Sequence, residues 1–324
     1  MFKRILVPLD GSDRAERALP IAARMAHASG GSIFLVRVVS TAPAALPSAP
    51  AKPILIQTVG ETDRALAESY LAGVAGSELL NGIPLQTFVP TGFVSTSIIS
   101  LAIEQHMDII VMCSHGYTGV TRWWLMGSVA AKVARFAHTP VLVLREGGPV
   151  PQERHPGDRP LSVLVPLDGS DYATASLTPA ADLAATLAAP GQGALHLTHI
   201  IQPAADTRGA MRALRATQNT QARENMAKEY LTAMIQRVRS RSEDPAIANL
   251  MFTSSVTSDD DIARGIIRVA EDGDDGEGAG VFGGCEVIAL TTHGYSGPQR
   301  WVGSVTERVL HTSRLPLLIV RPEE

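Results

Sequence analysis

The sequence predicts an α/β protein made of two similar domains, each a parallel β-sheet flanked by helices. Three observations lead to this class. The chain has 324 residues, which is long for one α/β domain and suits two domains. Hydrophobic residues make up 45% and charged residues 19%, so both domains can bury a core. Finally, the chain repeats itself, and within each repeat short apolar runs alternate with amphipathic segments.

The repetition is carried by four motifs that occur twice in the same order. They read ILVPLDGSD and VLVPLDGSD from residues 5 and 163, SHGYTG and THGYSG from 114 and 292, GSV from 127 and 303, and PVLVLR and PLLIVR from 140 and 316. We therefore predict a first domain over 1–146, a Gly-, Pro- and charge-rich linker over 147–160, and a second domain over 161–324. The second domain carries an acidic, Gly-rich insertion at 271–284.

In the first repeat, the hydrophobic periodicity assigns the elements in order. Arg4–Leu9 is a continuous apolar run, typical of a strand buried on both faces. Ser12 or Asp13 caps the helix that follows, which runs to about His27 and stops at Gly30-Gly31. The remaining predictions are strands over Ser32–Val39, Leu85–Val89, Asp108–Met112 and Val141–Arg145, helices over Thr62–Leu80, Ser95–Gln105 and Ser128–Ala137, and a Pro- and Ala-rich loop over Thr41–Pro53.

The second repeat follows the same order. Its strands are predicted near 162–167, 195–201, 250–256, 286–291 and 317–321, and its second helix is long, over Ala216–Arg241. Alternating strands and helices indicate a parallel sheet with right-handed crossovers. The closing strands should be sheet edges, so we expect the two domains to pair through them as a pseudo-dimer within one chain. A homodimer is a further possibility.

Composition excludes several classes of function. The formal net charge is −4, and only four of the 28 cations are Lys, which argues against a nucleic-acid-binding protein. No apolar run is long enough to cross a membrane, and Asp10 interrupts the first one too early for a signal peptide. Cys113 and Cys285 form neither a disulfide framework nor a zinc motif. We expect a soluble, cytoplasmic protein.

Two motifs should meet at the carboxyl edge of each sheet, where ligands of this class bind. Asp10-Gly11-Ser12 follows the first strand, and Gly127-Ser128 begins a helix after a Gly-rich loop. A helix N-terminus attracts phosphate, and glycine allows close approach of the backbone. The pattern indicates a nucleotide site, although neither a Walker lysine nor a G-x-G-x-x-G fingerprint is present.

Taken together, these motifs resemble the universal stress protein family over about 3–145 and 161–321. The resemblance implies a five-stranded, flavodoxin-like or Rossmann-like sheet of order 3-2-1-4-5, and ATP binding as in one branch of the family. The adenosine end would contact Asp10, Val38 and Met112, and the phosphates would contact Gly116, Gly127, Ser128 and Val129. The matching positions of the second repeat are Asp168, Ile200, Leu290, Gly294, Gly303, Ser304 and Val305. Mg²⁺ would bridge the phosphates, with Arg122 as the nearest cation in sequence.

The Gly-rich loops depart from the family signature of Gly, two residues, Gly, nine residues and Gly-Ser. Cys113 and Thr291 replace the first Gly, and the nine-residue gap becomes ten residues in the first repeat and eight in the second. Pro298 also removes a backbone donor in the second loop. We therefore predict that the first repeat is the better nucleotide site.

Simpler interpretations stand beside these. Asp10 and Asp168 can be turn residues, and Gly127-Ser128 and Gly303-Ser304 can be plain helix caps. His115 and His293 lack a partnering acid in their motif and are expected to hydrogen-bond within the loop rather than to catalyse. Cys113 is expected to be a small core residue, and Trp123, Trp124 and Trp301 are expected to pack under the loops.

The leading hypothesis is an ATP-binding stress sensor or adaptor that is not an enzyme and acts on an unknown protein partner. Slow ATP hydrolysis stays open. The alternatives are a scaffold of the same fold that binds no nucleotide and, more weakly, an ATP-using enzyme.

Overall fold

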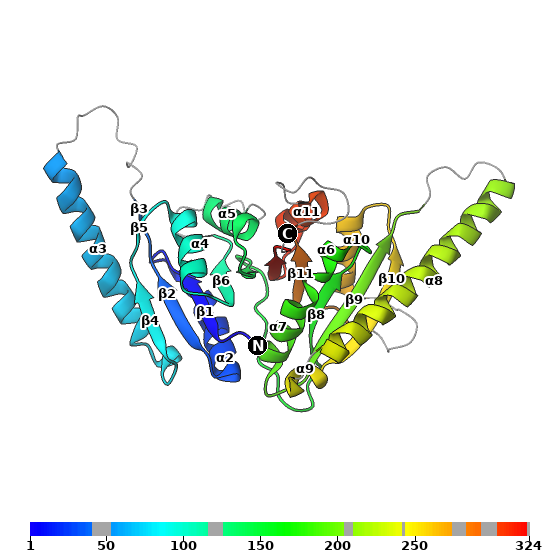
Figure 1. The fold of residues 1–324 in the computed structure, drawn as a ribbon, viewed down its shortest axis with the longest axis horizontal. Helices are drawn as coiled ribbons and strands as arrows, with labels where there is room; N and C mark the ends of the chain where they lie inside the picture. The colour runs from blue at the N-terminus through cyan, green and yellow to red at the C-terminus, as the bar shows by residue number, and fades with distance from the viewer. Residues whose placement is uncertain are drawn as a thin grey trace. The chain divides into compact units, whose positions relative to one another are not determined.

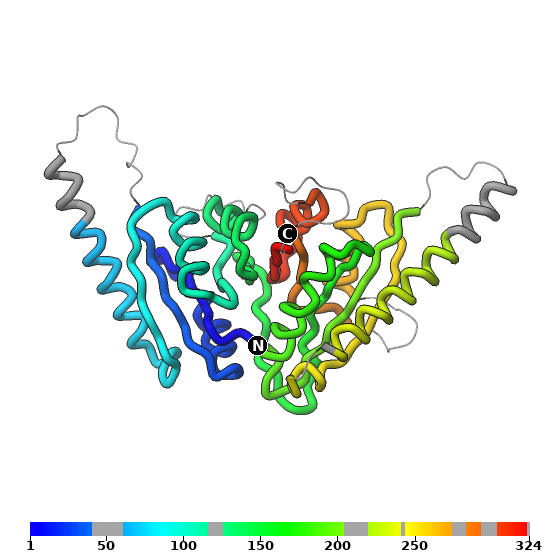
Figure 2. Tube along the Cα trace, in the orientation of Figure 1, coloured from blue at the N-terminus to red at the C-terminus, as the bar shows by residue number. Residues whose placement is uncertain are grey.

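The structure, a computed structural model, describes residues 1–40, 53–115, 126–203, 210–241, 244–273, 283–292 and 303–322. For 53–60, 210–219 and 241 it describes the backbone only. The chain divides into two units, which we call the first repeat (Phe2–Gly147) and the second repeat (Gly148–Glu324 together with Met1). Each is described by itself (Figures 1 and 2).

The first repeat is built on a parallel sheet (Figure 1). In its described part the strands lie in the order β4-β2-β1-β6-β7, and every pair in this order is parallel. The strands are β1 (Arg4–Pro8), β2 (Ser32–Val36), β4 (Leu85–Phe88), β6 (Ile109–Cys113) and β7 (Val141–Leu144), with a separate short ladder between β3 (Val39–Ser40) and β5 (Thr91–Gly92). This confirms the predicted order 3-2-1-4-5.

Helices connect these strands and cover the sheet. They are α1 (Asp13–Glu16), α2 (Ala18–Ser29), α3 (Pro53–Ala75), the 3₁₀-helix η1 (Glu78–Leu80), α4 (Val94–Glu104) and α5 (Ser128–Phe136). Right-handed crossovers place α2 and α3 on one face of the sheet and α4 and α5 on the other; α4 and α5 pack against each other there. Every βα turn after a strand therefore opens at the same edge, the carboxyl edge of the sheet.

The second repeat has the same topology. Its described strands lie in the order β10-β9-β8-β11-β12, again all parallel. The strands are β8 (Leu161–Pro166), β9 (Gly193–Ile201), β10 (Met251–Ser258), β11 (Val287–Thr291) and β12 (Leu317–Val320), and the helices are α6 (Asp171–Thr174), α7 (Leu177–Ala188), α8 (Ala210–Arg241), α9 (Pro245–Ala248), α10 (Ile262–Asp272) and α11 (Ser304–Thr312).

The central strands form the core of each repeat. Ile5, Leu6 and Val7 of β1 are 0% exposed, as are Val163, Leu164 and Val165 of β8. Consecutive residues of a strand point to opposite faces, so such a run is buried only when helices cover both faces of the sheet. The unbroken apolar runs of the two repeats therefore have the burial that the sequence predicted.

Several predicted boundaries were wrong. The helix predicted over 62–80 runs from Pro53 to Ala75 and is followed by η1, and the one predicted from Ala216 begins at Ala210. Pro53 stands at the first helical position, where its missing N–H costs nothing. The helix predicted from 13 to 27 is interrupted at Arg17. Glu271 and Asp272, assigned to the acidic insertion, end α10, and 274–282 lie outside the described residues.

Candidate functional site

The Asp-Gly-Ser turn after β1 is held by its own hydrogen bonds. Oδ1 of Asp10 accepts from the backbone N of Ser12 (3.0 Å) and from its Oγ (2.6 Å). Ser12 in turn caps α1, since its Oγ accepts from the N of Ala15 (3.2 Å). Gly11 has φ +90°, a conformation that favours glycine. The turn thus fixes an exposed carboxylate at the carboxyl edge of the sheet.

The second repeat reproduces this turn almost unchanged. Oδ1 of Asp168 accepts from the N and the Oγ of Ser170 at 2.9 and 2.6 Å, and the Oγ of Ser170 accepts from the N of Ala173 at 3.2 Å. Gly169 has φ +86°. Both aspartates therefore have the turn role that was the simpler interpretation, and their contact with a ligand stays a prediction.

The Gly-Ser pairs open a helix at the same edge. Gly127 is the N-cap of α5, with φ −59°, ψ 150° and no side-chain capping hydrogen bond. Its N–H donates to the carbonyl of Ser114 (2.7 Å), and a Cβ on Gly127 would stand 2.8 Å from that oxygen. Ser128, interpreted as a possible cap, is instead the exposed first helical residue. Within the described residues, no side chain caps the first N–H groups of α5, which can therefore meet a ligand or water.

Gly303 occupies the same place at the start of α11. It has φ −57° and ψ 144°, again without a side-chain cap, and its N–H donates to the carbonyl of Thr292 (2.7 Å). Gly303 thus repeats the backbone geometry and the N–H bond of Gly127. Ser304 follows as the first residue of the helix, as Ser128 does in the first repeat.

Some of the other residues predicted to contact the nucleotide also lie at this edge of the sheet. Val38 follows β2 and is half-buried, and Met112 lies near the end of β6, paired with Val143 and 5% exposed. Ile200 in β9 and Leu290 in β11 are buried at the corresponding strand ends. Val129 and Val305 are the second residues of their helices. Gly116, Gly294, His293, Arg122 and the three tryptophans lie outside the described residues.

Three side chains beside the first turn were missed by the sequence analysis. The guanidinium of Arg37 stacks on Tyr70, with Cζ 4.9 Å from the ring centroid, and a Cβ on Gly11 would stand 3.2 Å from it. The hydroxyl of Tyr70 donates to Oε1 of Glu16 (2.7 Å). Burial, and then Glu16, raise the pKa of Tyr70 well above its usual value. Arg37 places a cation at the turn. In the sequence, its position directly before Val38, a predicted contact of the nucleotide, was the signal that could have identified it.

His115 has an acidic partner that lies outside its sequence motif. Its Nδ1 lies 3.1 Å from Oγ of Ser114 and 3.4 Å from Oε2 of Glu146, and its side chain is 4% exposed. Glu146 also donates its N–H to Ser114 Oγ (3.1 Å) and pairs with Nε of Arg14 (3.0 Å). The sequence motif did not contain this acid because Glu146 comes from the end of the domain. The network ties the start of the loop to the strand β7, which supports a structural role.

Cys113 ends β6 and is half-buried, with Sγ 3.9 Å from the carbonyl of Ala15. Burial raises the pKa of its thiol to about 12. A redox-active cysteine needs a lowered pKa, so this raised pKa speaks against a redox role for Cys113. Cys285 is buried, and the pKa of its thiol is raised for the same reason.

Two parallel sheets, each with an acidic turn and an open Gly-Ser helix start at its carboxyl edge, define a tandem protein of the Rossmann-like α/β class. The profile of the universal stress protein family matches residues 1–145 and 161–321. The chain belongs to this family.

Individual relatives agree with this assignment. A universal stress protein of Methanocaldococcus jannaschii is 29% identical over 147 residues, which are 45% of this chain and 84% of the relative. One from Thermus aquaticus is 32% identical over 148 residues, 45% of this chain and 100% of the relative. The crystal structure of a universal stress protein from Archaeoglobus fulgidus covers 99% of this chain and 97% of its own, with a TM-score of 0.62 and 18% identity, and so matches the fold across both repeats.

No helix in the described part of the chain is long and apolar enough to cross a membrane.

Proposed function

We propose that the first repeat binds ATP together with Mg²⁺, and that the chain acts as a cytoplasmic stress sensor or adaptor rather than as an enzyme. The uncapped start of α5 at Gly127 carries the proposal. It stands at the same sheet edge as the Asp10 turn, because β6 and β1 are parallel neighbours. One motif attracts phosphate through N–H groups and the helix dipole, and the other offers a carboxylate to a ribose or base donor.

The nucleotide would span this edge. Asp10, Val38 and Met112 would hold the adenosine end, and the N–H groups of Ser128 and Val129 would meet the phosphates. Arg37 adds a cation beside the turn. Mg²⁺, when bound, would neutralise part of the phosphate charge alongside Arg37.

Calorimetry with ATP and Mg²⁺ tests the proposal. Titration of the wild-type protein should give a heat of binding that fits one dominant ATP site. Gly127→Val should weaken binding about tenfold or more, because the new side chain displaces the helix start from Ser114. Gly303→Val is the matched control and should leave the dominant site intact. Circular dichroism checks that both variants fold.

Absence of heat for wild type at millimolar ATP would remove the nucleotide proposal. Equal loss in both glycine variants would show that the two repeats share the binding. Release of phosphate above the rate of the Gly127→Val variant would favour the enzymatic alternative.

A nucleotide-free scaffold is the second candidate. It is favoured by the turn itself, since Oδ1 of each aspartate is already occupied by a serine of the chain. Pairing of the two repeats through the closing strands, and a homodimer beyond it, belong to either candidate. Sedimentation analysis with and without ATP measures the oligomeric state, and a nucleotide-independent result favours the scaffold.

A further inference from the structure

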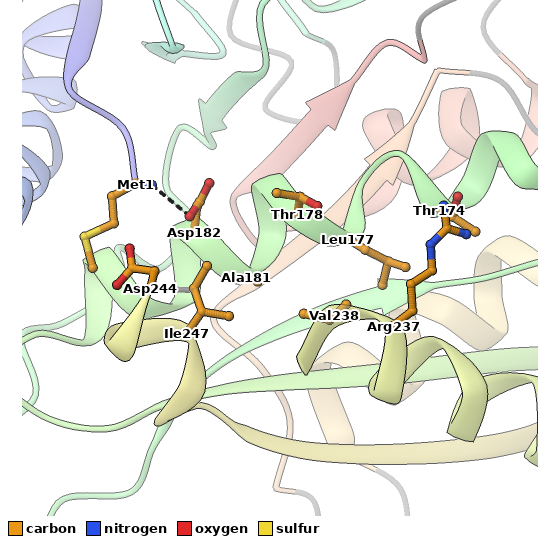
Figure 3. Close-up of a pocket in the computed structure, with 10 residues that line it drawn as sticks. All are labelled: Met1, Thr174, Leu177, Thr178, Ala181, Asp182, Arg237, Val238, Asp244 and Ile247. Carbon is orange, nitrogen blue, oxygen red and sulfur yellow. Dashed lines mark hydrogen bonds and ion pairs between the residues drawn. The ribbon is translucent and has the colours of Figure 1, made fainter. Parts of the chain in front are cut away.

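A cavity of about 280 Å³ lies in the second repeat, between α7, α8 and α9 (Figure 3). Its lining residues are Met1, Thr174, Leu177, Thr178, Ala181, Asp182, Arg237, Val238, Asp244 and Ile247. Those from Thr174 to Asp182 recur at the spacing of one helix face. The lining shares no residue with the candidate nucleotide site.

Among the described residues that line this cavity, Arg237 is the charge that no opposite charge compensates. Oδ1 of Asp182 accepts a hydrogen bond from the amino group of Met1 (2.9 Å). Asp244 caps α9, because its Oδ1 accepts a hydrogen bond from the backbone N of Ala246 (2.9 Å). No carboxylate among the described side chains pairs with the half-buried Arg237. Figure 3 shows its side chain extending toward the Thr174 end of the cavity, away from the two acids. The cavity therefore lacks one anion at that end.

A second donor lies on the same helix as Arg237. The hydroxyl of Tyr230 is buried and has no hydrogen-bond partner among the described residues. Tyr230 precedes Arg237 by seven residues, about two helical turns, on the same face of α8. Burial and the nearby Asp168 and Asp171 raise the pKa of Tyr230, against the effect of Arg237. The phenol is therefore protonated at neutral pH and can only donate to an anion.

The first repeat shows which group satisfies such a tyrosine. Tyr70 and Tyr230 are equivalent, since both stand in an Ala-x-x-Tyr-Leu motif whose Ala and Leu are buried. Tyr70 donates to the carboxylate of Glu16 at 2.7 Å. The residue 158 positions after Glu16 is Thr174, which lines the cavity and whose Oγ1 donates to the carbonyl of Asp171 (2.7 Å). The second repeat has kept the donor and lost the carboxylate.

We propose that this cavity binds a small organic monocarboxylate, whose carboxylate pairs with Arg237 at the Thr174 end, near the Tyr230 hydroxyl. The apolar part of the ligand lies along Leu177, Ala181 and Val238. The chain thus takes from solution the group that Glu16 supplies in the first repeat.

The neighbouring acids restrict the ligand to a single negative charge. Asp168 is engaged by Ser170 through Oδ1, and Asp171 is exposed in the first turn of α6. Both repel an anion near Tyr230, and at the other end Asp244 does the same. One guanidinium can offset one carboxylate in this field, so a phosphate or a dicarboxylate is disfavoured.

The test uses pentanoate as probe on the full chain, with binding followed by ligand-observed NMR in the presence and absence of ATP. Pentanoate should bind saturably, and the uncharged pentanamide should not. Arg237→Met should weaken binding about tenfold or more, since it removes the charged donor. Arg239→Met on the same helix is the matched control, because that guanidinium stacks on Phe252 instead, and it should bind as wild type does.

A gain-of-carboxylate variant makes the test independent of lost stability. Thr174→Glu restores the carboxylate of the first repeat, so it should abolish pentanoate binding while raising the melting temperature. The proposal is overturned if pentanoate fails to bind at millimolar concentration, if pentanamide binds equally, or if Arg237→Met or Thr174→Glu binds as wild type does. Because the cavity and the nucleotide site share no residue, these outcomes are independent of ATP binding.

Discussion

The two repeats keep the same backbone geometry at the carboxyl edge and differ in the charges placed around it. The three hydrogen bonds of the Asp-Gly-Ser turn agree within 0.1 Å between the repeats. Arg37, Glu16 and Glu146 of the first repeat correspond to His199, Thr174 and Pro322 of the second. Duplication thus preserved what the fold needs, and the side chains beside the edge were free to diverge.

The helix that begins at each Gly-Ser pair shows the same divergence. The first turn of α5 continues with Ala131 and Lys132, whereas that of α11 continues with Glu307 and Arg308. Arg308 forms an ion pair with Asp261, the cap of α10, while Lys132 is exposed and pairs with no carboxylate in the described part of the chain. The start of α5 is therefore the more positive of the two, which agrees with the preference for the first repeat.

The largest effect should come from the shared core. Leu71 and Leu231 occupy equivalent positions in α3 and α8, and both are 0% exposed. Replacing either with Ala leaves a cavity and should lower the free energy of unfolding of its own repeat by about 2–5 kcal/mol. Urea unfolding followed by hydrogen exchange resolves the two repeats. If only the mutated repeat loses stability, the two cores are independent. If both repeats lose the same stability, they unfold as one unit.

Much of this fold could be predicted from the sequence, because it depends on patterns among residues that are close together in the chain. Continuous apolar strands, the Ser12 cap and the Gly-Ser helix starts follow from periodicity and turn chemistry. The contacts of Arg37, Tyr70 and Glu146 were not accessible, because each joins separate elements. Arg37 stacks on Tyr70, Tyr70 bonds Glu16 54 positions away, and Glu146 bonds Ser114 32 positions away. The sequence carried two hints, the position of Arg37 directly before Val38 and the recurrence of Tyr70 as Tyr230.

An intermediate effect is expected from the two tyrosines. Tyr70→Phe removes the hydrogen bond to Glu16 and leaves a carboxylate without its donor, which should lower the free energy of unfolding by about 1–2 kcal/mol. Tyr230→Phe removes a hydroxyl that has no partner, so its cost should be near zero or the change should stabilise. Thermal unfolding of both variants without added carboxylate measures the difference. Equal losses would mean that the Tyr230 hydroxyl is satisfied in solution.

The smallest effect, and the most direct measure of the difference between the repeats, comes from exchanging one charge at the helix starts. Ala131→Glu places the acid of α11 in the first turn of α5. A negative charge there opposes the helix dipole effect on phosphate by about 0.3–1 kcal/mol, so ATP should bind roughly two- to fivefold more weakly at low salt. Glu307→Ala makes the reverse change in the second repeat and should bring its weaker site closer to the first. Calorimetry at two salt concentrations checks both variants, because screening reduces a charge effect. If both substitutions leave ATP affinity unchanged, the first turns of α5 and α11 do not meet the phosphates, and the difference between the repeats must arise from the side chains around Asp10 and Asp168.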